Sequence, residues 1–295
     1  MFAVDPGEGW RALLVTAYLF LVIASYVMLK AVRDSLYLDE YGAVKLPYVI
    51  IGIAILVGLF VDLYIRVSRH VRVPTLIVLT LGACMACLLT FWTLGRAGQT
   101  WLYPVLYIWV GCFGVIAPVQ VWTLINEVFA TRQVKRLVGF IGAGGILGGA
   151  IGGTTTGTLA ARVGTINLLL VVIALLLVCT GLVTALAPHR RTETVAEVAA
   201  RPRHLRDAAR KILSSRHLMV IGGLVWISAL STTVVDFQFK SAAAAHGFTK
   251  DGLTAFFGTA YGLMSLGSLA AQLLAVRFLL RRAGVGVVIL VLPLL

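Results

Sequence analysis

The sequence predicts an all-α membrane protein folded as a helical bundle, and three observations lead to this class. Hydrophobic residues make up 60% of the 295 residues. Charged residues make up 13%, whereas a soluble domain contains roughly 25%. The mean hydropathy is +0.97, and the apolar residues are gathered in runs of about 20 residues or more, the length that a helix needs to cross a bilayer.

Eight of these apolar runs are long enough to be complete spans. The first follows the acidic segment MFAVDPGEGWR, so we expect it to be kept as a span rather than cleaved as a signal peptide. A ninth run begins near Gly284 and continues to Leu295, and we expect the chain to be truncated there. The eight predicted spans are 11–36, 46–66, 73–94, 101–129, 137–161, 166–187, 217–240 and 253–277.

The basic residues predict the orientation of the chain. If the N-terminus is cytoplasmic, the loops after spans two, four, six and eight are cytoplasmic too, and they contain most of the 25 lysines and arginines. Short cytoplasmic loops are enriched in these residues. The net charge of +13 is therefore explained by loops facing the cytoplasm, and we expect the lipid bilayer, not a nucleic acid, as the partner of this charge.

A long polar segment divides the chain into two parts. Residues 1–187 form a predicted six-span bundle, and residues 217–295 form part of a second bundle. Between them, residues 188–216 are rich in arginine, and their apolar residues fall on one face of a helix. We expect this linker to be a basic amphipathic helix on the inner membrane surface.

The two parts show a weak internal repeat. Shifted by 210 residues, Lys30 falls on Lys240, each near the end of a span, and Arg72 falls on Arg282, each in a short basic loop. Two parallel six-span halves joined by a central loop are the layout of the major facilitator superfamily. The repeat thus predicts a similar bundle of twelve spans, of which about four would follow Leu295.

Ionisable residues inside the spans are the candidate functional residues, because charges are costly in hydrocarbon. Span one contains Lys30, Arg33 and Asp34, and span seven contains Asp236 and Lys240. Lysine and arginine bind phosphate as a point charge and as a fork, respectively. The alternative is that Lys30 and Arg33 extend to the outer interface as isolated charges.

Polar and aromatic residues add further candidates. Tyr26 shares the helical face of Lys30, and span four ends with Trp122, Asn126 and Glu127. Glu127 is either an ordinary charge at a helix end or part of a gate, a substrate site or a proton site.

Span five contains two interleaved glycine rows in the sequence GFIGAGGILGGAIGG. It lacks the lysine and the preceding strand of a phosphate-binding loop. Small residues four apart allow helix backbones to approach closely. We therefore predict a packing seam formed by Gly144, Gly148 and Gly152 and by Gly145, Gly149 and Gly153.

Other chemistry is not indicated. The four cysteines lie inside apolar runs without metal-ligand spacing, and the five histidines are scattered. There is no H-E-x-x-H or G-x-S-x-G motif. We expect a protein that is not an enzyme and that has no cofactor or metal.

Three segments resemble the ATP/ADP translocase family, the nucleotide transporters of plastids and obligate intracellular bacteria. They are LKAVRDSL (29–36), WTLINEV leading into VKR (122–136) and VVDFQFK (234–240). The resemblance implies that Lys30, Glu127 and Asp236 take the places of the family's functional lysine and two acids, with aspartate where a glutamate is expected. The segments FFGTAYGLMSLGSLAAQLL and LLRRAGVG look like the family's bacterial relatives, which implies a bacterial inner membrane.

The resulting expectation is a nucleotide exchanger that works by alternating access. Lys30, Arg33 and Lys240 would hold phosphate oxygens, Tyr26 and Trp122 could stack on a base, and Glu127 and Asp236 would hold the cations when substrate is absent. With the outer mouth closed, Lys30 or Arg33 would pair with Asp236, and Asp34 with Lys240. Two alternatives are a proton-coupled carrier of another solute and a membrane sensor or scaffold domain.

Overall fold

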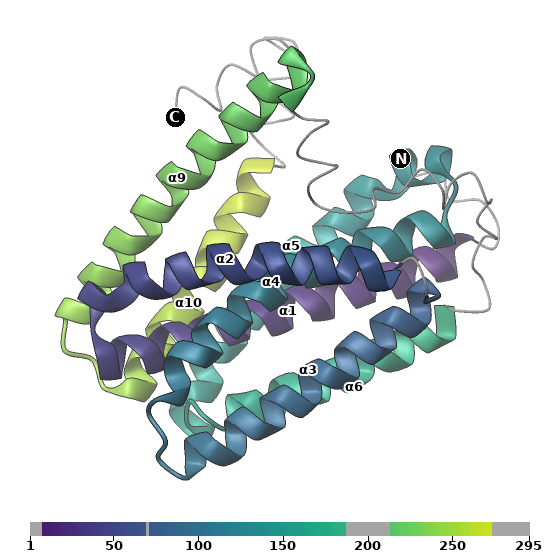
Figure 1. The fold of residues 1–295 in the computed structure, drawn as a ribbon. Coiled ribbons are helices and arrows are strands. Elements are labelled where there is room, and N and C mark those ends of the chain that lie inside the picture. The colour runs from purple at the N-terminus through teal and green to yellow at the C-terminus, as the bar shows by residue number, and fades with distance from the viewer. Residues whose placement is uncertain (1–7, 69–70, 187–212, 273–295) are drawn as a thin grey trace.

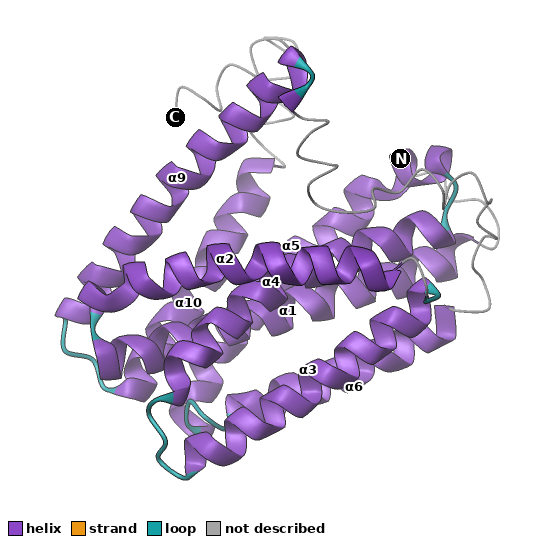
Figure 2. Cartoon of the chain, in the orientation of Figure 1, coloured by secondary structure: helices purple, strands orange, loops and turns teal. Residues whose placement is uncertain are grey.

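The computed structural model describes residues 8–68, 71–186 and 213–272, and helix is the regular structure throughout them (Figure 2). Eight helices in these residues are long and apolar enough to cross a membrane. The predicted all-α membrane bundle with eight complete spans is confirmed. The amphipathic linker helix and the start of the ninth span lie outside the described residues, and the division into two bundles stays a prediction.

The helices follow the predicted spans closely, and three of them extend clearly further. They are the first helix, the fifth helix and the helix of the seventh span, which continues past residue 240 to Ala245. The elements are α1 (Glu8–Tyr41), η1 (Ala43–Lys45), α2 (Leu46–Ser68), α3 (Val73–Arg96), α4 (Leu102–Val128), α5 (Thr131–Val163), α6 (Leu168–Leu186), α9 (Arg216–Ala245) and α10 (Lys250–Ala271).

The extension of α1 changes the position of its charges. The helix has 34 residues, about 50 Å at a rise of 1.5 Å per residue, while the hydrocarbon layer is roughly 30 Å thick. Lys30 therefore does not lie near the end of its helix, as the apolar run suggested. The helix continues past it to Tyr41 and ends where Gly42 adopts a φ of 69°.

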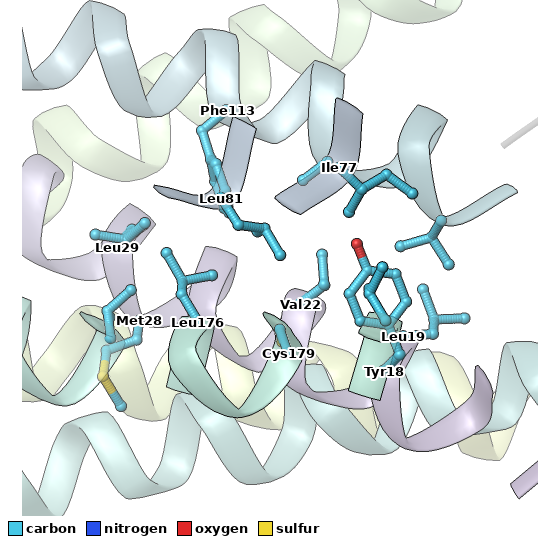
Figure 3. Close-up of a cluster of buried hydrophobic side chains, with 14 of the residues drawn as sticks. Tyr18, Leu19, Val22, Met28, Leu29, Ile77, Leu81, Phe113, Leu176 and Cys179 are labelled. Carbon is cyan, nitrogen blue, oxygen red and sulfur yellow. The ribbon is translucent and has the colours of Figure 1, made fainter. Parts of the chain in front are cut away.

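An apolar core holds α1 among α3, α4 and α6. Figure 3 shows Tyr18, Leu19 and Val22 of α1 facing buried side chains of the neighbouring helices. Those neighbours include Ile77 and Leu81 of α3, Phe113 of α4, and Leu176 and Cys179 of α6. Cys179 is buried as a small apolar group, as expected for a cysteine in an apolar run.

The first glycine row of α5 faces α1, and the second row passes from α1 at Gly145 to α10 at Gly149 and Gly153. In the first row, a Cβ added at Gly152 would lie 2.6 Å from Ala24 Cα of α1. In the second row, a Cβ added at Gly153 would lie 2.6 Å from Gly262 Cα of α10. Real Cβ atoms do not approach other atoms this closely. The predicted packing seam is confirmed, and its second row joins the first six helices to α10.

The last two helices lie differently against the first six. α10 packs along α5 and α1. α9 is exposed over residues 216–235, and its buried residues are Lys240 and Ala243, near its C-terminal end. Figure 1 accordingly shows α9 diverging from the rest of the bundle toward its N-terminal end. The contacts of α9 are therefore concentrated at the end of the bundle where α1 and α9 finish.

The seam predicts that alanine at Gly152 destabilises the bundle. The added methyl group would overlap the backbone of Ala24, and we expect a loss of about 1–3 kcal/mol in the free energy of unfolding. The matched control is Gly139→Ala in the same helix, where an added Cβ has no atom within 4 Å. That change should be neutral or stabilise by up to about 1 kcal/mol. Unfolding of the detergent-solubilised variants measures both, and equal effects would contradict the seam.

Candidate functional site

Five charged residues from α1 and α9 form one ion cluster. Lys240 Nζ lies 3.2 Å from Asp34 Oδ1 and 2.5 Å from Asp236 Oδ2. Lys30 Nζ lies 3.5 Å from Asp236 Oδ1, and Arg33 Nε lies 3.4 Å from Asp34 Oδ1. The two pairs expected between spans one and seven, Lys30 with Asp236 and Asp34 with Lys240, are both present. We call these five residues the ion cluster.

The centre of the ion cluster is removed from solvent. Asp34 is fully buried, and the side chains of Lys240 and Arg33 are 2% and 7% exposed. Removing charges from water is costly, and attraction between them offsets that cost only when further hydrogen bonds satisfy the groups. This burial contradicts the alternative in which Arg33 extends to the outer interface as an isolated charge.

Two tyrosines supply those further bonds, and sequence reasoning missed both. Tyr261 of α10 donates its hydroxyl proton to Asp34 Oδ2 over 2.7 Å. Lys240 donates to the hydroxyl of Tyr107 on α4 over 3.0 Å, and Arg33 donates to the Tyr107 carbonyl oxygen over 3.4 Å. No spacing within α4 or α10 connects these tyrosines to charges on α1, so only the packing reveals them.

The same tyrosines present their rings to the cations. The Arg33 guanidinium lies 4.5 Å from the centre of the Tyr107 ring. The Lys30 ammonium lies 4.1 Å from the centre of the Tyr261 ring. Both distances are within the range of cation–π attraction. The cations are therefore held by rings as well as by carboxylates.

A cavity of about 500 Å³ begins directly beside the ion cluster. It is lined by α1, α5 and α10, and the lining residues include Tyr26 and Lys30 of α1 and Tyr261, Ser265 and Ser268 of α10. Lys30 is the last lining residue along α1, and Arg33 and Asp34 lie one turn further on. The cavity thus ends at Lys30 and Tyr261, and the cluster closes that end.

The remaining predicted residues lie elsewhere on the bundle. Glu127 follows Tyr107 by twenty residues in α4, about 30 Å along the helix axis. It is buried, whereas Trp122 and Asn126 are exposed. In this conformation Glu127 therefore lies far from the ion cluster, and its role in holding the cations stays a prediction. Tyr26 lines the cavity and Trp122 does not, so stacking of a base on Trp122 stays a prediction.

Within residues 8–68, 71–186 and 213–272, no three histidine, cysteine, aspartate or glutamate side chains are grouped so that they could hold a metal ion.

The comparison with known proteins gives one match. The family model described as Major Facilitator Superfamily matches residues 121–295. No curated protein and no solved structure matches the chain.

The burial of the Asp34–Lys240 pair predicts strong energetic coupling. We expect Asp34→Asn and Lys240→Met each to lower the free energy of unfolding by about 3–5 kcal/mol, because each leaves a buried charge without its main partner. The double variant should lose clearly less than the sum, with a coupling of about 2 kcal/mol or more. Unfolding of the four proteins in mixed micelles measures this cycle.

The matched control is the pair formed by Asp62 and Arg66. These side chains are 2.6 Å apart on one helix, with exposed fractions of 23% and 59%. Solvent screens such a pair, so its coupling should be below about 1 kcal/mol. Additive effects at Asp34 and Lys240 would show that the buried pair does not join the two helices.

Proposed function

The chain belongs to the major facilitator superfamily, and we propose that it is a nucleotide transporter that exchanges ATP- and ADP-type molecules. The superfamily and the eight apolar helices make it an integral, multi-pass secondary transporter. Within that family, the observation that supports an anionic substrate is Lys30 at the closed end of the cavity, beside the ion cluster. The proposed setting is the bacterial inner membrane, with a cytoplasmic N-terminus.

Charge supports an anion as the substrate. Among the described residues that line the cavity, Lys30 is the one with a charge. Its side chain is 25% exposed, so an incoming ligand can reach it. The ion cluster as a whole contains three cations and two carboxylates, which leaves one positive charge without a matching acid. A phosphate oxygen at Lys30 would supply the missing negative charge through a charge-assisted hydrogen bond.

The shape and lining of the cavity support a nucleotide. A volume of about 500 Å³ lies in the range of roughly 300–1,000 Å³ that small-molecule sites occupy. Tyr26 lines the cavity one helical turn before Lys30, so a base could stack on its ring while the phosphates meet Lys30. The resemblance of residues 29–36 and 234–240 to nucleotide transporters points to the same substrate class.

The ion cluster gives alternating access a physical basis. When the cavity is empty, Asp236 and Asp34 neutralise the cations and hold α9 and α10 against α1. A bound phosphate competes for Lys30 first, and then for Arg33 and Lys240. Because the substrate replaces the carboxylates, the loaded carrier opens its outer end more easily than the empty one, which is the requirement for exchange. We propose that Asn126 and Glu127 act at the opposite end of α4, as part of an inner gate.

Counterflow in liposomes tests this proposal. The full-length protein is reconstituted with unlabelled ATP, ADP or phosphate inside, and uptake of labelled ATP is followed. We expect uptake that depends on the internal nucleotide. In the Lys30→Gln variant, uptake at low ATP concentration should fall by about tenfold to a hundredfold, since a hydrogen bond to a charged group is lost. The exposed Lys45, changed to Gln, is the control and should keep its exchange activity.

Two results would argue against nucleotide exchange. Uptake of labelled ATP at a rate independent of the solute inside the liposomes would contradict exchange of external for internal nucleotide. Absence of uptake under every loading, together with transport of another solute driven by a pH gradient, would favour a proton-coupled carrier.

A further inference from the structure

We propose that Tyr261 is a positioning residue that couples the cavity to the closed outer end of the bundle. Its ring holds the Lys30 ammonium at the cavity, and its hydroxyl holds Asp34 in the pair with Lys240. This inference deepens the proposed function and rests on it for the identity of the anion. The coupling itself can be measured without any substrate.

The ring of Tyr261 lies between the cavity and the cluster. It lines the cavity, and the Lys30 ammonium sits 4.1 Å from its centre. Lys30 also meets Asp236 at the long distance of 3.5 Å. The ammonium is therefore held by two weak contacts, and an anion in the cavity can draw it away from both.

The hydroxyl of Tyr261 connects α10 to α1. It donates over 2.7 Å to Asp34 Oδ2, while Lys240 of α9 faces the other oxygen of the same carboxylate at 3.2 Å. Asp34 is thus the point where three helices meet through polar contacts. Separating α10 from α1 at this end breaks the bond from Tyr261, and with it the support of the Asp34–Lys240 pair.

The surroundings of Tyr261 hold its ring in place. The ring is 6% exposed and stacks on Phe257, with centres 5.9 Å apart and planes 15° apart. On either side of it in the sequence, Gly258 and Gly262 pack against the backbone of α5. Because the ring stacks on Phe257 of the same helix, it moves with the α10 backbone. A shift of α10 therefore changes the contacts to Lys30 and to Asp34 together.

The test uses a probe at the outer end of α9. Ala243 is 4% exposed and packs in the apolar cluster that joins α9 to α1 at this end. Ala243→Cys is introduced after the four native cysteines are replaced, and its labelling by a maleimide is timed in detergent without substrate. In a protein with Tyr261→Phe, which keeps the ring and removes the hydroxyl, we expect labelling to be faster by about tenfold to a hundredfold.

The matched control is Tyr103→Phe. Tyr103 accepts a hydrogen bond from Lys250 over 3.2 Å, and it does not line the cavity. Its variant loses a buried hydroxyl without touching Lys30 or Asp34, so labelling at position 243 should stay within about twofold of the parent. Equal labelling in the Tyr261→Phe protein and the parent, or equal acceleration in both variants, would overturn the proposal.

A second variant distinguishes the contribution of the Tyr261 ring from that of its hydroxyl. Tyr261→Leu removes both, so the Lys30 ammonium loses its ring as well. In counterflow, its half-saturating ATP concentration should rise by about threefold or more over that of Tyr261→Phe, which keeps the ring. Equal values in the two variants would overturn the role of the ring. If the parent protein exchanged no nucleotide at all, the proposed function would fail, while the labelling result would still decide the coupling.

Discussion

The structure depends on one buried interaction, the ion pair between Asp34 of α1 and Lys240 of α9. α9 is exposed along most of its length and has its buried residues beside this pair. A buried ion pair is a weak source of stability, because its desolvation cost can exceed its attraction. The pair instead contributes specificity, because α1 and α9 form it in one register. Tyr107 and Tyr261 support the pair, because one accepts a hydrogen bond from Lys240 and the other donates one to Asp34 Oδ2.

The pair also explains the position of the cavity. Beyond it, toward the other end of the bundle, α9 diverges from its neighbours (Figure 1), and the cavity lies between α1, α5 and α10. The glycine seam holds α10 close to α5 while the ion cluster closes one end, so the cavity ends at Lys30. Lys30 is also the most exposed cation of the ion cluster, with a side chain 25% exposed against 7% for Arg33 and 2% for Lys240. In the proposed mechanism, substrate binding and closure of this end thus involve the same side chains.

Much of this arrangement could be predicted from the sequence. Runs of apolar residues predict the spans, and charges inside such runs predict the pairs of Lys30 with Asp236 and of Asp34 with Lys240. The tyrosines could not be predicted, because an aromatic residue in a span usually packs in the core and nothing in its spacing indicates a distant carboxylate. Lys30 was expected near a helix end, because the apolar run stops a few residues after it. The helix itself continues to Tyr41. Glu127 was grouped with these charges through the resemblance to the translocase family, although it lies near the other end of α4.

The most direct test of the account is the distance across the outer end of the bundle with and without nucleotide. Spin labels at Val44 in η1 and Ala245 at the end of α9, both exposed, report that distance by pulsed electron resonance. The account predicts a single short distance in the empty protein and a second, longer population when ATP is added. The longer population should be absent when Lys30 is replaced by glutamine. An unchanged distance distribution at saturating ATP would contradict the claim that the substrate opens the ion cluster.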